Sequence, residues 1–241
     1  MAFYFAASVG ITAQAPPDPE ALYRQREHIE SAQQAADIWD ARAKAGTDFE
    51  ATWKLAKACY WIGTHGPEKD RRAALERGVA AGDQAAKLQP AKPEGHFWGA
   101  ANMGALAESF GLSQGLKYRG RIKDALLKVL AINPAWEQGS ADRALGWWYH
   151  KVPGLFGGSE ATAEDHLRKA LAYNPQSTAT LYFLGEVLLE RGKKADAKTT
   201  FQQVLDAPIL PDWAPEDRDF KAKAKTSLAR SMGWGLRHCT R

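Results

Sequence analysis

The sequence predicts an all-α protein built as a solenoid of helical hairpins. The main observation is a phrase that occurs three times, an apolar helix end that closes on a proline, at residues 85–90, 126–134 and 167–175. The closing prolines lie 44 and 41 residues apart, and recurrence on this scale is typical of stacked structural units. Proline cannot continue a helix and restricts the residue before it, so each phrase marks a helix end. Each unit is too thin to bury its own apolar stripe, so neighbouring units must cover one another.

Three hairpins are expected in order at about residues 50–90, 92–134 and 139–175. The first is the most degenerate and carries little beyond its aromatic residues. The second has Gly99 in its first helix, and the third has Gly146 directly after a leucine. A glycine at such a position leaves room for the paired helix, because an added side chain would overpack the contact.

The clearest hairpin is expected at about residues 178–211. Leu184 and Gly185 lie in its first helix, Gly192 turns the chain, and Phe201 lies in its second helix. This arrangement resembles the tetratricopeptide repeat. The resemblance implies a tetratricopeptide-like solenoid of about four hairpins plus capping helices.

We expect residues 16–241 to form a single repeat domain that ends in a capping helix over about residues 215–232. A coiled coil is the alternative, but the frequent Gly and Pro and the lack of a seven-residue period count against it. Hydrophobic residues are 45% and charged residues 25% of the chain, which is ordinary for a globular protein. The acid-poor basic run at residues 221–241 is interpreted as a polar cap. No basic stripe interleaves with aromatic residues, so nucleic-acid binding is not expected.

The first fifteen residues differ from the rest of the chain. Residues 1–15 carry no charge and end in Ala13-Gln14-Ala15, which resembles a signal-peptidase site. We therefore expect a signal segment and a periplasmic or otherwise exported protein. The absence of a Lys or Arg before the apolar stretch and the presence of Pro16 directly after it weaken this interpretation, and an ordered apolar segment of a cytoplasmic protein is the alternative. The stretch is too short to span a bilayer and no other segment is as continuously apolar, so no transmembrane span is expected.

The sequence offers no constellation for catalysis. The six histidines show no His-Glu-x-x-His pairing, and the glycine-rich residues 154–159 lack the Gly-Lys-Ser/Thr ending of a phosphate loop. Cys59 and Cys239 have no metal-ligand spacing and imply no disulfide framework. We therefore predict a non-enzymatic binding or scaffolding protein with no catalytic residue, cofactor or metal.

The repeat assigns one face of each first helix to the inner, concave surface. Counting from the repeat glycine places the following side chains on that surface: Trp61, His96, Met103, Arg143, Trp147, His150, Tyr182 and Glu186. Aromatic rings with a few polar heads suit an apolar ligand or an extended peptide. Trp147 and His150 could grip an apolar solute with one acidic end, with Arg143 as the counter-charge. Alternatively, a short stack twists shut and these residues form the core.

Two turns within hairpins are expected to be enlarged, at residues 104–120 and 150–159. Both contain apolar residues, which are unusual in solvated loops. We expect these segments to fold back onto the stack or to meet a partner.

Two stretches resemble a known family more specifically. Residues 139–149, with the Lys-Val-Pro-Gly and Gly-Gly that follow them, and residues 94–104 resemble the T component of TRAP transporter systems. The resemblance covers roughly residues 50–210. It implies a periplasmic tetratricopeptide protein that partners an extracytoplasmic solute-binding protein and hands over apolar solutes. The absence of a lipobox cysteine and the degenerate first hairpin depart from that family.

Two functions are therefore predicted. The first is an exported binding protein that assists a solute-binding protein in the uptake of small apolar or organic-acid solutes. The alternative is a protein–protein interaction scaffold that binds a peptide in its concave surface. The oligomeric state stays open, a homo-oligomer included.

Overall fold

The computed structural model describes residues 17–231, and over that range it contains eleven α-helices, two short 3₁₀ helices and no strand. The helices are α1 (Pro19–Arg24), α2 (Ile29–Ala43), α3 (Phe49–His65), α4 (Glu68–Leu88), α5 (Pro93–Ser109), α6 (Leu112–Ile132), α7 (Ser140–Lys151), η1 (Gly154–Phe156), α8 (Glu160–Tyr173), α9 (Thr178–Glu190), α10 (Lys194–Asp206), η2 (Pro211–Trp213) and α11 (Ala214–Ser231). The predicted all-α hairpin solenoid is confirmed. The predicted signal segment, residues 1–15, and Cys239 lie outside the described residues.

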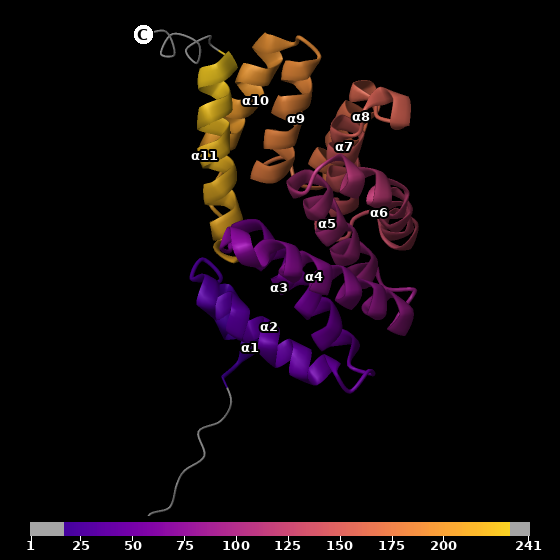
Figure 1. The fold of residues 1–241 in the computed structure, drawn as a ribbon. Coiled ribbons are helices and arrows are strands. Elements are labelled where there is room, and N and C mark those ends of the chain that lie inside the picture. The colour runs from indigo at the N-terminus through magenta and orange to yellow at the C-terminus, as the bar shows by residue number, and fades with distance from the viewer. Residues whose placement is uncertain (1–16, 232–241) are drawn as a thin grey trace, which may run out of the picture.

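Consecutive helices form a curved stack of antiparallel hairpins (Figure 1). The hairpins are α3–α4, α5–α6, α7–α8 and α9–α10, and each packs on the next. Helices α1 and α2 precede the first hairpin. The last helix, α11, packs against α9 and α10. It begins beside the N-terminal helices and runs away from them along α9 and α10 (Figure 1).

Local sequence signals fix where several helices begin and end. The carboxylate of Asp48 accepts a hydrogen bond from the Ala51 N–H at the start of α3, and Ser159 and Ser177 cap α8 and α9 in the same way. Helices α6 and α8 each stop at an asparagine that precedes a proline, as the repeated phrase predicts. None of the helices between residues 17 and 231 combines the length and apolarity that a bilayer crossing needs.

Glycines let the two helices of three hairpins approach closely. A Cβ atom at Gly185 would lie 2.4 Å from Cε1 of Phe201, and one at Gly146 would lie 2.6 Å from Cγ of Leu167. Gly63 of α3 stands in the same relation to Leu75 of α4. In each case the glycine of the first helix faces the second helix of its own hairpin.

Gly99 of α5 faces a different neighbour. A Cβ atom at Gly82 of α4 would lie 2.4 Å from Cα of Gly99, so this glycine packs against the preceding hairpin. The side chain of Asn102, on the same face, donates a hydrogen bond of 2.9 Å to the carbonyl of Ala56 in α3. Helix α5 is therefore rotated relative to the register that the sequence suggested.

One of the two predicted enlarged turns is wrong. Residues 104–120 continue α5 and begin α6, and the helices are joined at Gly111, whose φ of 84° is in the left-handed region that glycine adopts readily. The extra residues lengthen the helices instead of forming a loop. Residues 152–159 do connect α7 to α8, and within them Leu155 is 91% exposed.

The buried apolar residues form two clusters. The larger runs from α1 to α7, and the smaller joins α8, α9, α10 and α11. Tyr149 of α7 packs against both clusters. The stack is thus continuous at α7, while α11 belongs to the smaller cluster alone.

Candidate functional site: the central cavity

The inner helices and α11 line a cavity of about 1000 Å³ that is partly open to solvent. Its walls come from α3, α5, α7 and α9, with further residues from α1, α6, η2 and α11. In a tetratricopeptide-like stack the first helix of each hairpin lies on the concave side, so the cavity occupies the surface that the sequence assigns to binding. A concave space of this size is the usual form of a ligand site.

Aromatic side chains dominate the cavity wall. The lining includes Tyr23, Tyr60, Trp61, Phe97, Trp98, Trp147, Trp148, Phe156, Tyr182, Phe183, Trp213 and Phe220. Rings from three helices meet in a ladder: Trp147 stacks on Phe183 at 4.3 Å between centroids, and Phe183 meets Phe220 edge-on at 5.5 Å. The Trp147 indole N–H donates a hydrogen bond of 2.5 Å to the Glu108 carboxylate. The wall therefore offers broad apolar area with polar atoms at its edges.

Arg143 is a cation in the wall of the cavity. Burial lowers the pKa of its guanidinium, and the negative charge of the Glu137 carboxylate opposes that shift. Among the described residues, no carboxylate is close enough to form an ion pair with Arg143. Arg143 is half-buried, and a partly desolvated cation without an ion-pair partner favours an anion or another hydrogen-bond acceptor beside it.

Glu137 lies at the same end of the cavity in an unusual backbone conformation. The φ angles of Glu137, Gln138 and Gly139 are 41°, 59° and 75°, and the first two belong to residues that adopt the left-handed region at a cost. The turn directs Glu137 and Gln138 to the cavity lining. One carboxylate oxygen of Glu137 is buried without a hydrogen-bond partner, and burial raises the pKa of this carboxyl.

Four of the predicted concave residues line the cavity: Trp61, Arg143, Trp147 and Tyr182. They come from three different helices, as the repeat register predicts. Trp61 is 4% exposed, and its indole N–H donates a hydrogen bond of 2.6 Å to the carbonyl of Arg26. It therefore joins α3 to the N-terminal helices as well as facing the cavity.

The predicted inward orientation is wrong for His96 and Met103. His96 hydrogen-bonds the carbonyl of Pro90 at 3.0 Å, and Met103 is buried in the core at 2% exposure. Because α5 is rotated, its cavity-lining positions include Phe97 and Gly104, each one residue further along the chain.

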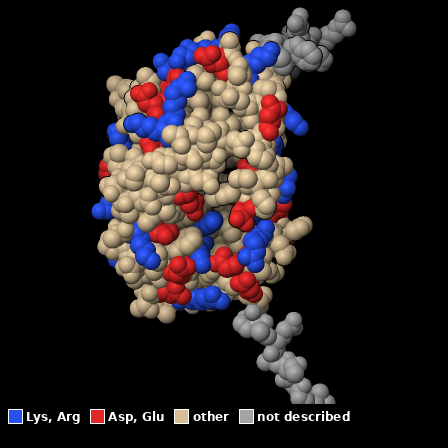
Figure 2. Space-filling view, turned by 180° about the vertical axis from the view of Figure 1, so that it is seen from behind, with Lys and Arg blue, Asp and Glu red and all other residues tan. Residues whose placement is uncertain are grey.

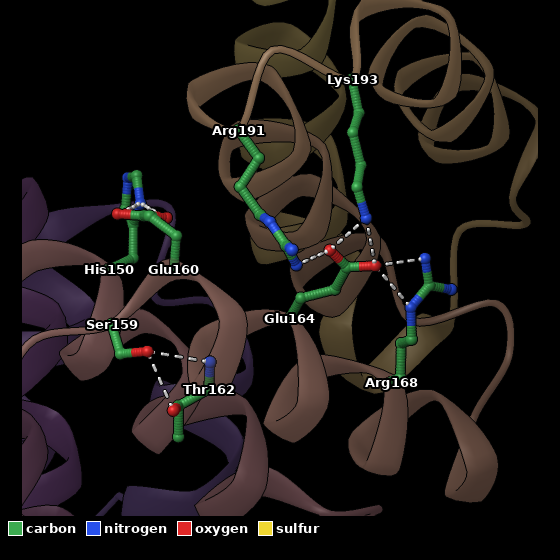
Figure 3. A network of polar contacts seen from close by, with 8 residues as sticks. All are labelled: His150, Ser159, Glu160, Thr162, Glu164, Arg168, Arg191 and Lys193. Atoms are coloured by element: carbon green, nitrogen blue, oxygen red, sulfur yellow. Dashed lines mark hydrogen bonds and ion pairs between the residues drawn. The ribbon is translucent and has the colours of Figure 1, made fainter.

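His150 and Glu186 also lie outside the cavity lining. Nδ1 of His150 lies 2.9 Å from the Glu160 carboxylate at the start of α8 (Figure 3). Glu186 binds Ser227 and Arg230 of α11. The predicted inward orientation of Glu186 is wrong because α11 covers the last turns of α9.

The sequence interpretation missed the contributions of α11 and of the segment before it. Phe220 and Trp213 line the cavity from a region that was expected only to cap the last repeat. The hint in the sequence was the presence of two large aromatic residues in a segment that is otherwise strongly polar.

The outer surface is more highly charged than the aromatic wall of the cavity. Figure 2 shows Lys and Arg interspersed with Asp and Glu at both ends of the face in view, with a band of uncharged residues between them. Interspersed charges of both signs are typical of solvated helix faces.

Comparison with known proteins supports both the fold and a family. The model of the family "Regulator of microtubule dynamics protein 1-3" matches residues 20–232. The "Regulator of microtubule dynamics protein 1" of Caenorhabditis elegans is 22% identical over 231 residues, which cover 87% of this chain and 96% of the relative.

The solved structures that are similar to this chain include two helical-repeat proteins. One is a thermophilic TPR protein of Thermus thermophilus, with a TM-score of 0.65, 20% identity, and coverage of 87% of this chain and 97% of that one. The other is MamA, with a TM-score of 0.51, 17% identity, and coverage of 83% and 95%. These likenesses show the tetratricopeptide-like fold, and the resemblance to the TRAP T component gains no support from them. Since the family model spans nearly all the described residues, the chain belongs to the family of regulators of microtubule dynamics proteins 1-3.

Proposed function

We propose that this chain is a non-enzymatic scaffold that binds a segment of another protein in its central cavity. The observation that carries this proposal is the aromatic lining of a concave, partly open space of about 1000 Å³. Large aromatic side chains in a sheltered pocket are the groups that dominate the energetics of protein recognition.

The polar groups of the wall fit a peptide better than a purely apolar molecule. The charged residues that line the cavity are Arg71, Arg119, Arg143, Lys151, Lys223, Glu108, Glu137, Glu216, Asp217 and Asp219. Both signs are represented, so the wall can pair with acidic and basic side chains as well as with backbone groups. An extended segment presents such groups at regular intervals.

The family and the nematode relative point to one partner class for the first test. Both are named for the regulation of microtubule dynamics, so the proposed partner is a microtubule or a protein bound to one. The measurement is co-sedimentation of the full chain with polymerised tubulin, alone and with cell extract.

The cavity variant Trp147→Ala should reduce co-sedimentation. The matched control is Leu127→Ala, because Leu127 is 44% exposed and lies outside the cavity lining. Equal co-sedimentation of both variants and the unmodified chain would show that the cavity is not the binding site.

Arg143 favours a second candidate function, the binding of a small apolar molecule with one acidic end. Such a ligand would place its anion against the unpaired guanidinium and its apolar part against the aromatic wall. The test compares the fluorescence of 1-naphthoate and uncharged 1-naphthamide on titration with the protein. Only naphthoate should lose affinity in the Arg143→Gln variant. Equal loss for both probes would show that Arg143 does not act as the counter-charge of the ligand.

Handover of such a solute to an extracytoplasmic solute-binding protein further requires export. That part of the proposal rests on the charge-free residues 1–15 and their Ala-Gln-Ala end. N-terminal sequencing of the natively produced protein tests it. Removal of residues 1–15 supports export, and a retained Met1 in cytosolic fractions contradicts it.

A further inference from the structure

The first turn of α11 meets the loop between α1 and α2, almost the whole length of the domain away in sequence. Arg26 donates a hydrogen bond of 3.0 Å from Nε to Glu216 and one of 2.9 Å to the carbonyl of Asp212. Arg218 donates a hydrogen bond of 3.1 Å to Glu27. We call these contacts the seam, and they join the two ends of the row of helices, the beginning of α11 and the N-terminal helices, into a ring (Figure 1).

The same segment is anchored on the other side to the last inner helix. The carboxylate of Asp217 accepts a hydrogen bond of 2.6 Å from the Thr178 hydroxyl and one of 2.8 Å from the Leu210 N–H. The first turn of α11 therefore bridges the beginning of α9 and the N-terminal helices. If the seam separates, this turn stays with α9.

The seam is bonded differently from the rest of the ring. Within residues 17–231, α11 contributes Ala224, Phe220 and Leu228 to the smaller apolar cluster, and none of its residues belongs to the cluster that contains α1 to α3. Across the seam the contacts are ion pairs, hydrogen bonds and the ammonium of Lys57, which lies 5.7 Å from the ring of Trp213. The Glu27–Arg218 pair is half-exposed, so it is weaker than apolar packing and is screened by salt. The Arg26 side chain is only 5% exposed, and separation of the seam returns its charge and that of Glu216 to water, which offsets part of the pairing energy that is lost.

We propose that the seam is a latch through which the ring opens sideways to admit a partner. This proposal rests on the proposed function of the cavity as a binding site. A segment inside a folded partner has no free end to thread through a closed ring, so it needs an opening in the wall. Separation at the seam supplies that opening without breaking either apolar cluster.

The experiment reverses charges at the more exposed pair, Glu27 and Arg218, whose side chains are both 49% exposed. Amide hydrogen exchange of the full chain is measured by mass spectrometry for the unmodified protein, Glu27→Arg, Arg218→Glu and the double variant. Each single variant should raise exchange in α1 and in the hydrogen-bonded turn of residues 25–28 that follows it by about fivefold. The double variant should restore it, because the pair is re-formed with opposite polarity.

The control is the pair Arg121–Asp83, which joins α6 to α4 and is 49% and 43% exposed. Its charge reversals should leave exchange at the seam unchanged. The proposal is overturned by unchanged exchange in the single variants, by no restoration in the double variant, or by a rise of equal size in α9 and α10. None of these readouts involves a partner, so failure of the latch is distinguishable from failure of the Trp147→Ala test of the cavity.

Discussion

Gly185 of α9 lies directly against the ring of Phe201 of α10, and a Cβ atom at residue 185 would stand 2.4 Å from Cε1 of that ring. Phe201 is fully buried and cannot move aside without disturbing the smaller apolar cluster. Replacing Gly185 by Leu should therefore lower the free energy of unfolding by ~1–3 kcal/mol. Urea denaturation followed by circular dichroism measures the change.

The matched control for this prediction is Gly104→Ala. Gly104 also lies within a helix, but a Cβ atom there has no neighbour within 4 Å. The substitution should stabilise the protein by about 0.5–1 kcal/mol, because glycine is the poorer helix former. Equal unfolding curves for Gly185→Leu and the unmodified chain would mean that α9 and α10 can separate at this point without cost.

Two adjacent tryptophans of α7 should differ in their structural importance. Both line the cavity, but Trp148 is 7% exposed and its N–H donates a hydrogen bond of 3.1 Å to the carbonyl of Arg119, whereas Trp147 is only half-buried. Trp148→Ala should cost ~3–5 kcal/mol of stability. Trp147→Ala should keep its helical content and weaken binding instead. Circular dichroism and thermal melts of both variants test the difference, and unfolding of the Trp147 variant would place that residue in the core.

The buried carboxyl of Glu137 should make stability depend on pH. Burial raises its pKa above the ordinary 4.5, so the folded protein holds this proton more tightly than the unfolded chain does. Between pH 4.5 and the raised pKa, stability therefore falls as pH rises, and at pH 7 the ionised group costs stability. Glu137→Gln should be more stable than the unmodified protein at pH 7 by roughly 1 kcal/mol.

The difference between the two proteins should shrink as pH falls toward 4.5, where the carboxyl is protonated. Chemical denaturation at several pH values measures it. A constant difference across that range would mean that ionisation of Glu137 is not responsible.

Glu164 should have the opposite pH dependence. Three cations bind its carboxylate: Arg168 at 2.7 Å, Lys193 at 2.9 Å, and Arg191 (Figure 3). Burial alone would raise the pKa of this carboxyl, but the hydrogen bonds from Lys193 and Arg168 outweigh it and lower the pKa below 4.5. Its contribution is therefore present above pH 4.5 and is lost as pH falls through the lowered pKa.

Glu164→Gln should cost roughly 1–3 kcal/mol at pH 7, because it removes charge-assisted bonds that hold α8 to the turn between α9 and α10. The exposed Glu190→Gln on α9 is the control and should be close to neutral. A loss for Glu164→Gln that is as large below the lowered pKa as at pH 7 would contradict the ionic explanation.

The sequence predicted the hairpins best where glycine and proline constrain the backbone. The helix ends before Pro134 and Pro175 follow from local sterics, and the close contact at Gly185 joins two helices that are neighbours in the chain. Helices α1 and α2 were expected only as unspecified caps. The buried face of α2 is mostly alanine, with Trp39 as its single large residue, so it lacks the apolar stripe by which the other helices are recognised.

The candidate site was predicted in part for a related reason. A register counted from one glycine places Arg143 and Trp147 correctly, because Gly146 faces the second helix of its own hairpin. The same count fails at His96 and Met103, because Gly99 faces the preceding hairpin. Which neighbour a glycine faces depends on packing between hairpins, and a single sequence does not record it.

The seam has a consequence for the order of events during synthesis. Its contacts join residues about 190 positions apart, whereas hairpins form from residues that are neighbours in the chain. Hairpins can therefore assemble while the chain is still emerging, and the ring closes last, after the residues around Glu216 have been made. Until then the aromatic wall faces water. A ribosome-bound chain that stops before α11 should expose a tryptophan-rich surface to chaperones. That surface becomes covered only when the two ends of the domain meet.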